Sequence, residues 1–327
     1  MFTSIPSPDP EWRYLEVPLT WFHDIGLTFM PAAFQIHAYA VFILGGIIIA
    51  CLLTAYRLKQ RGADGWYVVD IVLWGVVLGI IGARTFHVLT HPADYFGAGS
   101  DPWEVIRIWN GGIAIFGALI GGAIGVVIGC RSTGLRFTTV ADAIAPGLLI
   151  AQAMGRIGNY FNHELFGAPT TLPWGLEIEA DNPAFPIGLP ETTLFHPTFL
   201  YEAVWNLVGA ALILFLDRYR HLQWGKALSL YLIWYGVGRS VWETIRVDPS
   251  EMLWGIRVNV WMAFIAIAIG IVIWIMQSRA HKGLEPSPFR AGEEDGPSRV
   301  KSDTYSEAEL ANTPAAKAKA SEPVRAE

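Results

Sequence analysis

Long apolar runs, separated by short polar segments, dominate the chain. A helix needs about 20 apolar residues to cross roughly 30 Å of hydrocarbon, and seven runs reach or approach that length. The fourth run is short, which indicates a span that is broken or tilted. The pattern therefore predicts an all-α polytopic membrane protein with about seven transmembrane helices. The runs are 36–56, 67–90, 111–130, 138–155, 197–216, 227–246 and 258–278.

Basic residues in the connecting segments predict the orientation in the membrane. Arg57, Lys59 and Arg61 follow the first run, and Arg or Lys also follows the third, fifth and seventh runs. The segment 91–110 instead carries three acids against one Arg. Because cytoplasmic loops are enriched in Lys and Arg, we expect the N-terminus outside and the C-terminus in the cytoplasm. The segment of about 156–196 is then expected to form a small extracytoplasmic head domain.

Both ends of the chain differ in composition from the membrane domain expected at 36–282. Residues 1–35 are rich in proline and aromatic side chains, which is typical of a segment at the membrane interface. Residues 283–327 are rich in Ala, Glu, Lys, Pro and Ser. A chain of that composition buries too little apolar surface to fold. We therefore expect an interfacial, extracytoplasmic N-terminal arm and a disordered cytoplasmic tail.

The composition supports a membrane protein and argues against other classes. Of the 327 residues, 53% are hydrophobic and 16% are charged, whereas soluble domains carry about 25% charged residues. The net charge of −6 does not favour binding to nucleic acid. Cys51 and Cys130 lie in or at the end of apolar runs, so packing is their expected role. The metal-binding motif H-E-x-x-H is absent from the sequence.

Glycines recur at four-residue spacing in two of the apolar runs. Small residues at i and i+4 let two membrane helices approach closely. We interpret these glycines as a packing seam rather than as part of a site. They are Gly75 and Gly79 in the second run, and Gly117, Gly121, Gly125 and Gly129 in the third.

Polar residues gather directly after the fourth run, between Gly155 and Gly167. Ionisable side chains at membrane depth are costly unless they are paired or functional. Arg156, Asn159 and His163 share one face if the helix continues, but the glycines favour a bend or break here. A polar helix-capping loop is the alternative to a functional site. The stretch reads Gly155-Arg156-Ile157-Gly158-Asn159-Tyr160-Phe161-Asn162-His163-Glu164-Leu165-Phe166-Gly167.

Polar side chains of other runs fall at the same outer depth. With the expected orientation, six segments place polar side chains at the same membrane depth. Polar residues with separate structural roles would be scattered over different depths. Arginine outnumbers acid among them. The candidates are Tyr39, Arg84, Asn110, Arg156, Glu164, Glu202, Tyr235, Arg239, Glu243 and Arg246.

The expected pairing of these charges points to an external anion. Arg239 with Glu243, and Glu243 with Arg246, have the spacing of helical ion pairs. Arg156 has no acid at helical spacing on its own helix, so it is the best candidate to meet a ligand. Arginine favours bidentate contact with phosphate. At this depth, the expected anion is a phospholipid head group of the outer leaflet.

These residues resemble the prolipoprotein diacylglyceryl transferase family. The stretch from Gly155 to Glu164 is similar to the defining motif of that family, and the resemblance extends through nearly all of residues 30–278. It includes His37-Ala38-Tyr39, Trp109-Asn110-Gly111-Gly112, Asp142-Ala143-Ile144-Ala145-Pro146, His196-Pro197-Thr198-Phe199-Leu200-Tyr201-Glu202, Tyr235-Gly236-Val237-Gly238-Arg239 and Glu243.

The resemblance implies an enzyme of the bacterial plasma membrane with its active site facing the outer leaflet. Such an enzyme transfers the diacylglyceryl group of phosphatidylglycerol to the lipobox cysteine of a prolipoprotein. A thioether forms and glycerol 1-phosphate leaves, with no metal or soluble cofactor. The implied catalytic residues are Arg156 and Arg239. The implied substrate-binding residues are Arg156, Asn159, Asn162, Glu164, Tyr39, Glu202, Tyr235, Glu243, Arg246 and Arg84.

One position departs from the family pattern. Many members carry a histidine, proposed as the general base, where this chain has Phe116. His196, Glu202 and His37 are alternatives on the outer side. A mechanism without a side-chain base is equally compatible, because nearby cations lower the pKa of a thiol.

Two other function classes compete with the transferase. A transporter or flippase would bind an anionic lipid at the same cluster, but no internal repeat is evident and the cluster lies toward one face. An intramembrane protease would need a nucleophile and a base, and Ser240 has no histidine at a suggestive spacing. The sequence favours the transferase over both.

Overall fold

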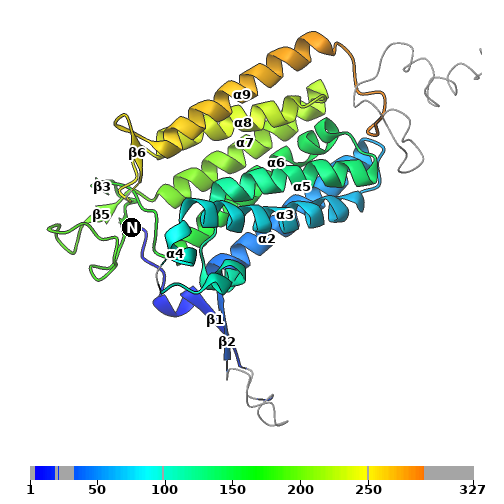
Figure 1. The fold of residues 1–327 in the computed structure, drawn as a ribbon. Coiled ribbons are helices and arrows are strands. Elements are labelled where there is room, and N and C mark those ends of the chain that lie inside the picture. Colours follow the sequence, from blue (N-terminus) through cyan, green and yellow to red (C-terminus); the bar gives the residue numbers. More distant parts are fainter. Residues whose placement is uncertain (1–3, 19–20, 22–32, 98, 249, 291–327) are drawn as a thin grey trace, which may run out of the picture. The chain divides into compact units, whose positions relative to one another are not determined.

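The computed structural model is mostly helical (Figure 1) and describes residues 4–18, 21, 33–97, 99–248 and 250–290. Each of the seven predicted runs overlaps a helix. Six described helices are long and apolar enough to cross a membrane. They are α2 (Ala38–Gln60), α3 (Tyr67–Thr90), α5 (Ile115–Thr133), α6 (Phe137–Phe161), α7 (Thr198–Arg220) and α9 (Val258–Ala280).

The sixth run, 227–246, is shorter as a helix than the hydropathy pattern predicts. Helix α8 (Lys226–Trp242) has 17 residues. The end of the predicted run is not helical: residues 243–245 form a turn and Arg246 lies in a β-bridge. Glu243 and Arg246 therefore lie just beyond the helix that carries Arg239.

Short elements connect the long helices. The helical ones are η1 (Pro10–Arg13), α4 (Pro92–Phe96), η2 (Pro102–Ile106) and η3 (Ile108–Asn110). The strands are β1 (Tyr14–Pro18), β2 (Ala33–His37), β3 (Pro169–Thr170), β4 (Leu176–Glu177), β5 (Leu194–Phe195), β6 (Met252–Leu253) and β7 (Ile256–Arg257). They form antiparallel pairs β1–β2 and β6–β7 and a three-stranded sheet of order β3-β5-β4. The prediction of an all-α protein is therefore incomplete.

The chain divides into two compact units. The first comprises Met1–Leu52 and Ile144–Lys282, and the second comprises Leu53–Ala143 and Gly283–Glu327. Helices α2 and α6 each contribute residues to both units.

Glycines let α3 and α5 approach closely in the second unit, as their spacing predicts. All four seam glycines of α5 are buried. A Cβ atom on Gly129 would lie 2.7 Å from the Cα of Ile71, and one on Gly125 would lie 2.8 Å from the Cα of Gly75. Larger side chains would force the helices apart, so the packing role is confirmed.

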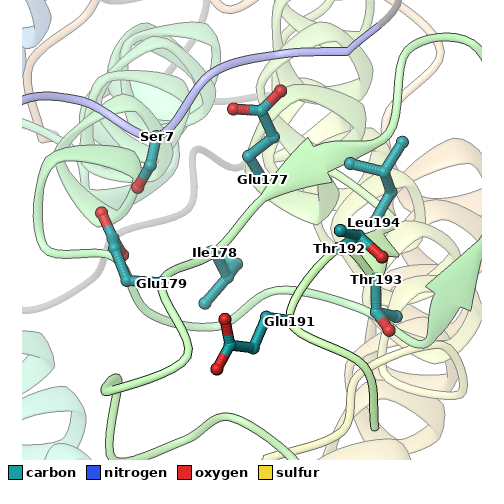
Figure 2. Close-up of a pocket in the computed structure, with 8 residues that line it drawn as sticks. All are labelled: Ser7, Glu177, Ile178, Glu179, Glu191, Thr192, Thr193 and Leu194. Carbon is teal, nitrogen blue, oxygen red and sulfur yellow. The ribbon is translucent and has the colours of Figure 1, made fainter.

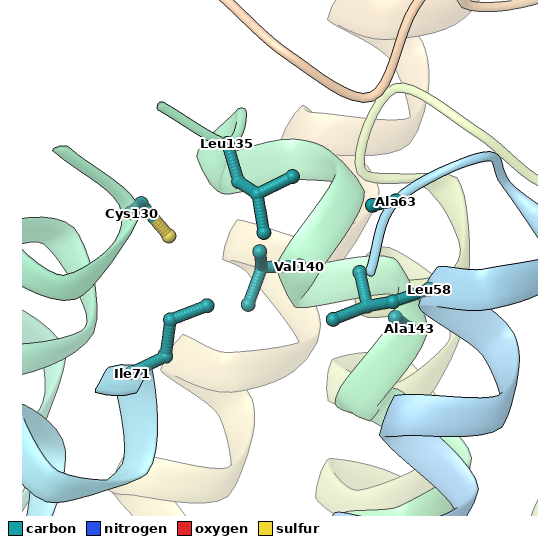
Figure 3. Packing of buried hydrophobic residues seen from close by; sticks show 7 residues of the cluster. All are labelled: Leu58, Ala63, Ile71, Cys130, Leu135, Val140 and Ala143. Carbon is teal, nitrogen blue, oxygen red and sulfur yellow. The ribbon is translucent and has the colours of Figure 1, made fainter. Parts of the chain in front are cut away.

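An apolar cluster fills the second unit near the α5–α6 turn (Figure 3). Cys130 is one of its buried members, which confirms the predicted packing role of this cysteine. The cluster consists of Leu58, Ala63, Ile71, Cys130, Leu135, Val140 and Ala143.

The predicted disordered tail begins too early. Phe289 packs against this cluster, with its ring 6.2 Å from that of Tyr67. Arg136 donates its backbone N–H to Pro288 O at 2.9 Å and its Nε to Phe289 O at 3.0 Å. Residues 283–290 are therefore part of the folded unit because one large aromatic side chain has a buried place to occupy. Residues 291–327 lie outside the described part of the chain.

Helix α6 runs unbroken to Phe161, which corrects the expectation of a short fourth span broken near Gly155. Its glycines serve close packing instead. A Cβ atom on Gly147 would lie 3.0 Å from the Cα of Ala50, and one on Gly158 would lie 2.8 Å from Cδ2 of Tyr39. The N-terminal part of α2 thus packs against α6 in the first unit and carries Tyr39 to the polar stretch.

Helix α8 packs beside α7 and α9 in the first unit (Figure 1). A buried apolar cluster joins α6, α7 and α8 around Leu149, Ala210 and Ala227. This packing brings the C-terminal end of α8 and the N-terminal end of α7 to the end of α6. A second buried cluster, made of Phe166, Leu176, Ile178 and Phe195, forms the core of residues 162–197 between α6 and α7, here called the head segment.

Candidate functional site

A single carboxylate, that of Glu202, lies between two arginines from different helices. Oε2 of Glu202 is 2.8 Å from Nε of Arg156 and 4.0 Å from Nη1 of Arg239. Arg156 is in the last two turns of α6, Glu202 in the first two turns of α7 and Arg239 in the last turn of α8. The structure thus brings the two predicted catalytic residues together. It also supplies a partner for Arg156 that spacing along its own helix did not reveal.

A second carboxylate, that of Glu243, is fully buried and collects further cations. Its Oε2 lies 2.9 Å from Nη2 of Arg239 and 3.9 Å from Nη1 of Arg246. Both predicted helical pairs are thereby confirmed. Its Oε1 accepts from Nη1 of Arg257 at 3.2 Å and from Nδ2 of Asn259 at 2.9 Å.

Three members of this network were missed by the sequence reasoning. Arg257 ends strand β7, and Asn259 lies in the first turn of α9. Asp248 accepts from Nε and Nη2 of Arg246 at 2.7 and 2.9 Å. The Arg246-Val247-Asp248 spacing was an available signal for that pair. Arg257 and Asp248 add one charge of each sign, so they extend the ion-pair network without changing its net charge.

The polar stretch at the end of α6 is held in place by hydrogen bonds between its own side chains. Nη1 of Arg156 donates to Oδ1 of Asn159 at 3.3 Å. Oε1 of Glu164 accepts from Nδ2 of Asn159 at 2.8 Å and from Nδ2 of Asn162 at 3.1 Å. The two amides and the carboxylate therefore form one hydrogen-bonded group attached to Arg156.

Gly167, the last glycine of the polar stretch, connects the stretch to the segment that follows α8. Gly167 forms a β-bridge with Arg246 and donates its N–H to His196 O at 2.9 Å. A Cβ atom on Gly167 would lie 2.8 Å from Cβ of His196 and 3.0 Å from Cγ2 of Ile245. A larger residue at this position would have to displace the side chains of His196 and Ile245.

Tyr39 and Tyr235 also lie in the first unit. Tyr39 packs against Gly158, within the polar stretch. The ring of Tyr235 stacks on that of Tyr231 with centroids 6.0 Å apart. Tyr235 precedes Arg239 by four residues on α8, so both belong to one face of that helix.

Arg84 lies in the second unit, and its guanidinium is engaged by backbone carbonyls. It donates Nε to Val105 O at 2.9 Å and Nη1 to Gly111 O and Gly112 O at 2.7 and 2.8 Å. Nη2 bonds to Glu104 O. These contacts fix the segment before α5, which begins at Ile115 rather than at 111. Within the second unit, Arg84 acts as a structural donor.

The alternatives for a general base lie in different surroundings. Phe116 contacts Phe86, with ring centroids 6.2 Å apart. Nδ1 of His196 lies 3.2 Å from the hydroxyl of Tyr201, and the ring of His37 meets that of Tyr14 edge-on at 4.6 Å. Glu202 is the one alternative that contacts the arginine pair.

The arrangement is suited to an anion that carries several oxygens. Nη1 of Arg239 is buried and has no hydrogen-bond acceptor within the described part of the chain. The side chain of Arg156 is 21% exposed, so it is not completely enclosed by the protein. A buried donor without an acceptor is costly, and a phosphate oxygen between the two arginines would satisfy it.

Comparisons with known proteins identify the family of the chain. The family model described as prolipoprotein diacylglyceryl transferase matches residues 27–276. A phosphatidylglycerol–prolipoprotein diacylglyceryl transferase of Leifsonia xyli subsp. xyli is 56% identical over 298 residues, which cover 89% of this chain and 86% of the relative. The enzyme of the same name from Paenarthrobacter aurescens is 48% identical over 75% of this chain and 79% of its own length. That from Cutibacterium acnes is 42% identical over 87% and 90%. The chain therefore belongs to the prolipoprotein diacylglyceryl transferase family.

Proposed function

We propose that this protein transfers the diacylglyceryl group of phosphatidylglycerol to the lipobox cysteine of prolipoproteins, the first step of lipoprotein maturation. The observation that carries the proposal is the pair Arg156 and Arg239 on one buried carboxylate, with a buried guanidinium donor left for a ligand. The relatives are named for phosphatidylglycerol and prolipoprotein as substrates, and a phosphate between two arginines fits the lipid.

The reaction exchanges one bond to carbon for another. The cysteine sulfur attacks the glyceryl carbon next to the phosphate and forms a carbon–sulfur bond. The carbon–oxygen bond breaks, and its electron pair leaves with the phosphate as glycerol 1-phosphate. The thiol proton is transferred to an acceptor, so charge and atoms balance. Negative charge grows on the departing phosphate, where preorganised cationic donors are most effective.

The two arginines perform this role from fixed positions. Glu243 holds one edge of the Arg239 guanidinium at 2.9 Å and leaves Nη1 facing Glu202. Glu202 in turn orients Arg156. We assign the phosphate to the space beside these three groups, where both guanidiniums donate to its oxygens. The same cations lower the pKa of an approaching thiol, which supplies the nucleophile without a histidine at position 116.

The glycerol head group is assigned to the hydrogen-bonded group of Asn159, Asn162 and Glu164. Two amides and a carboxylate supply both donors and acceptors for hydroxyl groups. Tyr39 and Tyr235 line the same end of the first unit and would contact the lipid. Arg246 acts through Glu243, because its bidentate bond to Asp248 occupies its other edge.

We propose the following membrane arrangement. Helix α8, at 17 residues and about 25 Å, is at the lower end of the range for a span, which gives seven spans with the six longer helices. Basic loops place the N-terminus outside and the C-terminus in the cytoplasm of a bacterial plasma membrane. The polar cluster then faces the outer leaflet, and the small sheet after α6 forms an extracytoplasmic head that admits the lipobox peptide.

The test is a transfer assay with purified protein in mixed micelles. Phosphatidylglycerol labelled in its acyl chains is incubated with a lipobox peptide, and a matched peptide with serine at the cysteine position serves as the control. The proposal predicts a thioether-linked diacylglyceryl peptide, one glycerol 1-phosphate per transfer, and no product with the serine peptide. Binding of the lipid without transfer to any lipobox peptide would replace the proposal with the lipid-transporter alternative.

A further inference from the structure

The segment of residues 4–13, here called the N-terminal clamp, lies outside the region that matches the family, which begins at residue 27. In the structure it nevertheless contacts the polar stretch that follows α6. We propose that the N-terminal clamp is a positioning element that holds the Asn162–Glu164 turn in the geometry that receives the lipid head group. This inference rests on the proposed function for the role of that turn, and its contacts are independent of it.

One part of the clamp extends the small sheet. Ile5 forms a parallel bridge with Leu176 of β4. Its N–H donates to Gly175 O at 2.8 Å, and its carbonyl accepts from the N–H of Glu177 at 2.9 Å. The Ile5 side chain packs against the buried cluster of the head segment. The clamp is therefore anchored by backbone bonds and by apolar burial.

The rest of the clamp reaches the polar stretch directly. The hydroxyl of Tyr160 donates to Pro6 O at 2.7 Å. Nη2 of Arg13 donates to Asn162 O at 3.3 Å. Two successive parts of the clamp thus bond to residues on either side of the end of α6, at Phe161.

Ser7 joins a buried histidine in the same turn. Its Oγ lies 3.3 Å from Nδ1 of His163, and that nitrogen lies 2.9 Å from Oε2 of Glu179. Nδ2 of Asn182 donates to His163 O at 2.8 Å. Figure 2 shows the Ser7 hydroxyl directed toward Glu179, and both side chains line a cavity of about 380 Å³. His163 is thereby held from the clamp and from the head segment together.

The turn needs such support because its backbone is strained. His163 and Leu165 have φ of 55° and 61°, in the left-handed region that costs L-residues about 1–2 kcal/mol each. Strained residues persist only where the surroundings over-determine them. The side chains of Asn162 and Glu164, which bond to each other and through Asn159 to Arg156, lie in and beside this turn. Loosening the clamp therefore displaces the residues assigned to the head group.

The test removes the first part of the clamp and returns it as a peptide. In the full-length protein, residues 2–8 are deleted, which removes the contacts of Ile5, Pro6 and Ser7 but keeps Arg13. A synthetic peptide of residues 2–9 is then added in trans. Ser7→Ala is the milder variant. Glu11→Gln, at an exposed position of the clamp, is the matched control.

Two measurements distinguish a failure of the clamp proposal from a failure of the proposed transferase function. Amide hydrogen exchange at 160–165 is measured in wild type and variants, and it needs no activity. We expect faster exchange in the deletion, and a KM for phosphatidylglycerol raised about fivefold, the size of one to two lost hydrogen bonds. The peptide should reverse both changes. Since the arginine pair is untouched, kcat should stay within about twofold of wild type.

Each outcome decides the proposal. Unchanged exchange at 160–165 after deletion overturns the clamp, as does faster exchange with an unchanged KM. Loss of kcat with no rescue by the peptide also overturns it, because that pattern indicates general destabilisation. If wild type transfers nothing, the proposed function fails separately, and the exchange data with peptide rescue alone decide whether the clamp holds the turn.

Discussion

Two tryptophans bond reciprocally across α7 and α8 and should control how Arg239 meets Glu202. Nε1 of Trp205 donates to Trp234 O at 3.1 Å, and Nε1 of Trp234 donates to Trp205 O at 3.0 Å. Their rings stack with centroids 4.3 Å apart and planes 19° apart. Trp205 lies three residues after Glu202, and Trp234 lies five residues before Arg239. The pair therefore fixes the spacing of the helices that carry the site.

The perturbation is Trp205→Phe or Trp234→Phe, which keeps an aromatic ring and removes one N–H donor. A net hydrogen bond contributes about 0.5–1.5 kcal/mol, and the smaller ring gives up some buried area at about 25 cal/mol per Å². Each single variant should lose about 1–2 kcal/mol of stability. The double variant should lose less than the sum of both, because the pair acts as one unit.

The effect on activity should exceed the effect on stability. A misplacement of about 1 Å in a catalytic group can cost on the order of a hundredfold in rate, and a partial shift of α8 should lower kcat about tenfold. Thermal unfolding in detergent and initial transfer rates measure the two effects. Trp261→Phe is the matched control, since Nε1 of Trp261 also donates to a carbonyl, that of Leu253, at 3.1 Å but not between α7 and α8. Equal losses of kcat in Trp205→Phe and Trp261→Phe would refute the reasoning.

Three further predictions concern other parts of the molecule. Glu243→Gln should destabilise the protein by about 3–5 kcal/mol and abolish transfer, because it leaves the guanidiniums around this buried site without their shared carboxylate. A loss of unfolding free energy below about 1 kcal/mol would contradict this. Burial alone raises the pKa of Glu179, but hydrogen bonds from Ser7, its own backbone N–H and His163 lower it overall. The stability that ionised Glu179 adds is therefore fully present above its ordinary pKa of 4.5 and is lost as pH falls through the lower pKa of the folded state. Amide hydrogen exchange in the head segment should therefore become faster at acidic pH in wild type but not in Glu179→Gln. Phe289→Ala should cost about 2 kcal/mol, less than the roughly 3–5 kcal/mol of a fully buried phenylalanine, and an unchanged melting temperature would indicate that the 283–290 segment does not stabilise its unit.

The spans were predictable because hydropathy is a property of one segment at a time. The ends of α7 and α9 agree with the apolar runs within a few residues, and the Arg239–Glu243 pair follows from helical spacing alone. The continuation of α6 was not predictable, because a glycine such as Gly158 serves equally to end a helix and to admit a neighbour such as Tyr39. Only the packing against α2 decides between the two.

Partners on different segments were equally hidden from the sequence. The Arg156–Glu202 contact joins residues 46 positions apart in the sequence, and Arg257 reaches Glu243 from the start of another helix. No periodicity connects such pairs. Phe289 illustrates the same limit for composition, since one aromatic residue in a polar segment is enough to dock it when an apolar cluster lies within reach.

The central claim is that Arg156 and Arg239 together hold the phosphate that leaves. It is tested most directly by measuring transfer from phosphatidylglycerol to a lipobox peptide in nanodiscs for wild type, Arg156→Ala, Arg239→Ala and Arg131→Ala. Arg131 is an exposed arginine at the end of α5 and serves as the control for loss of one positive charge. The account predicts that both site variants lose at least about a hundredfold in kcat/KM, as for removal of a single charge-stabilising donor, while Arg131→Ala keeps its activity. Folded Arg156→Ala or Arg239→Ala protein with transfer within about threefold of wild type would contradict it.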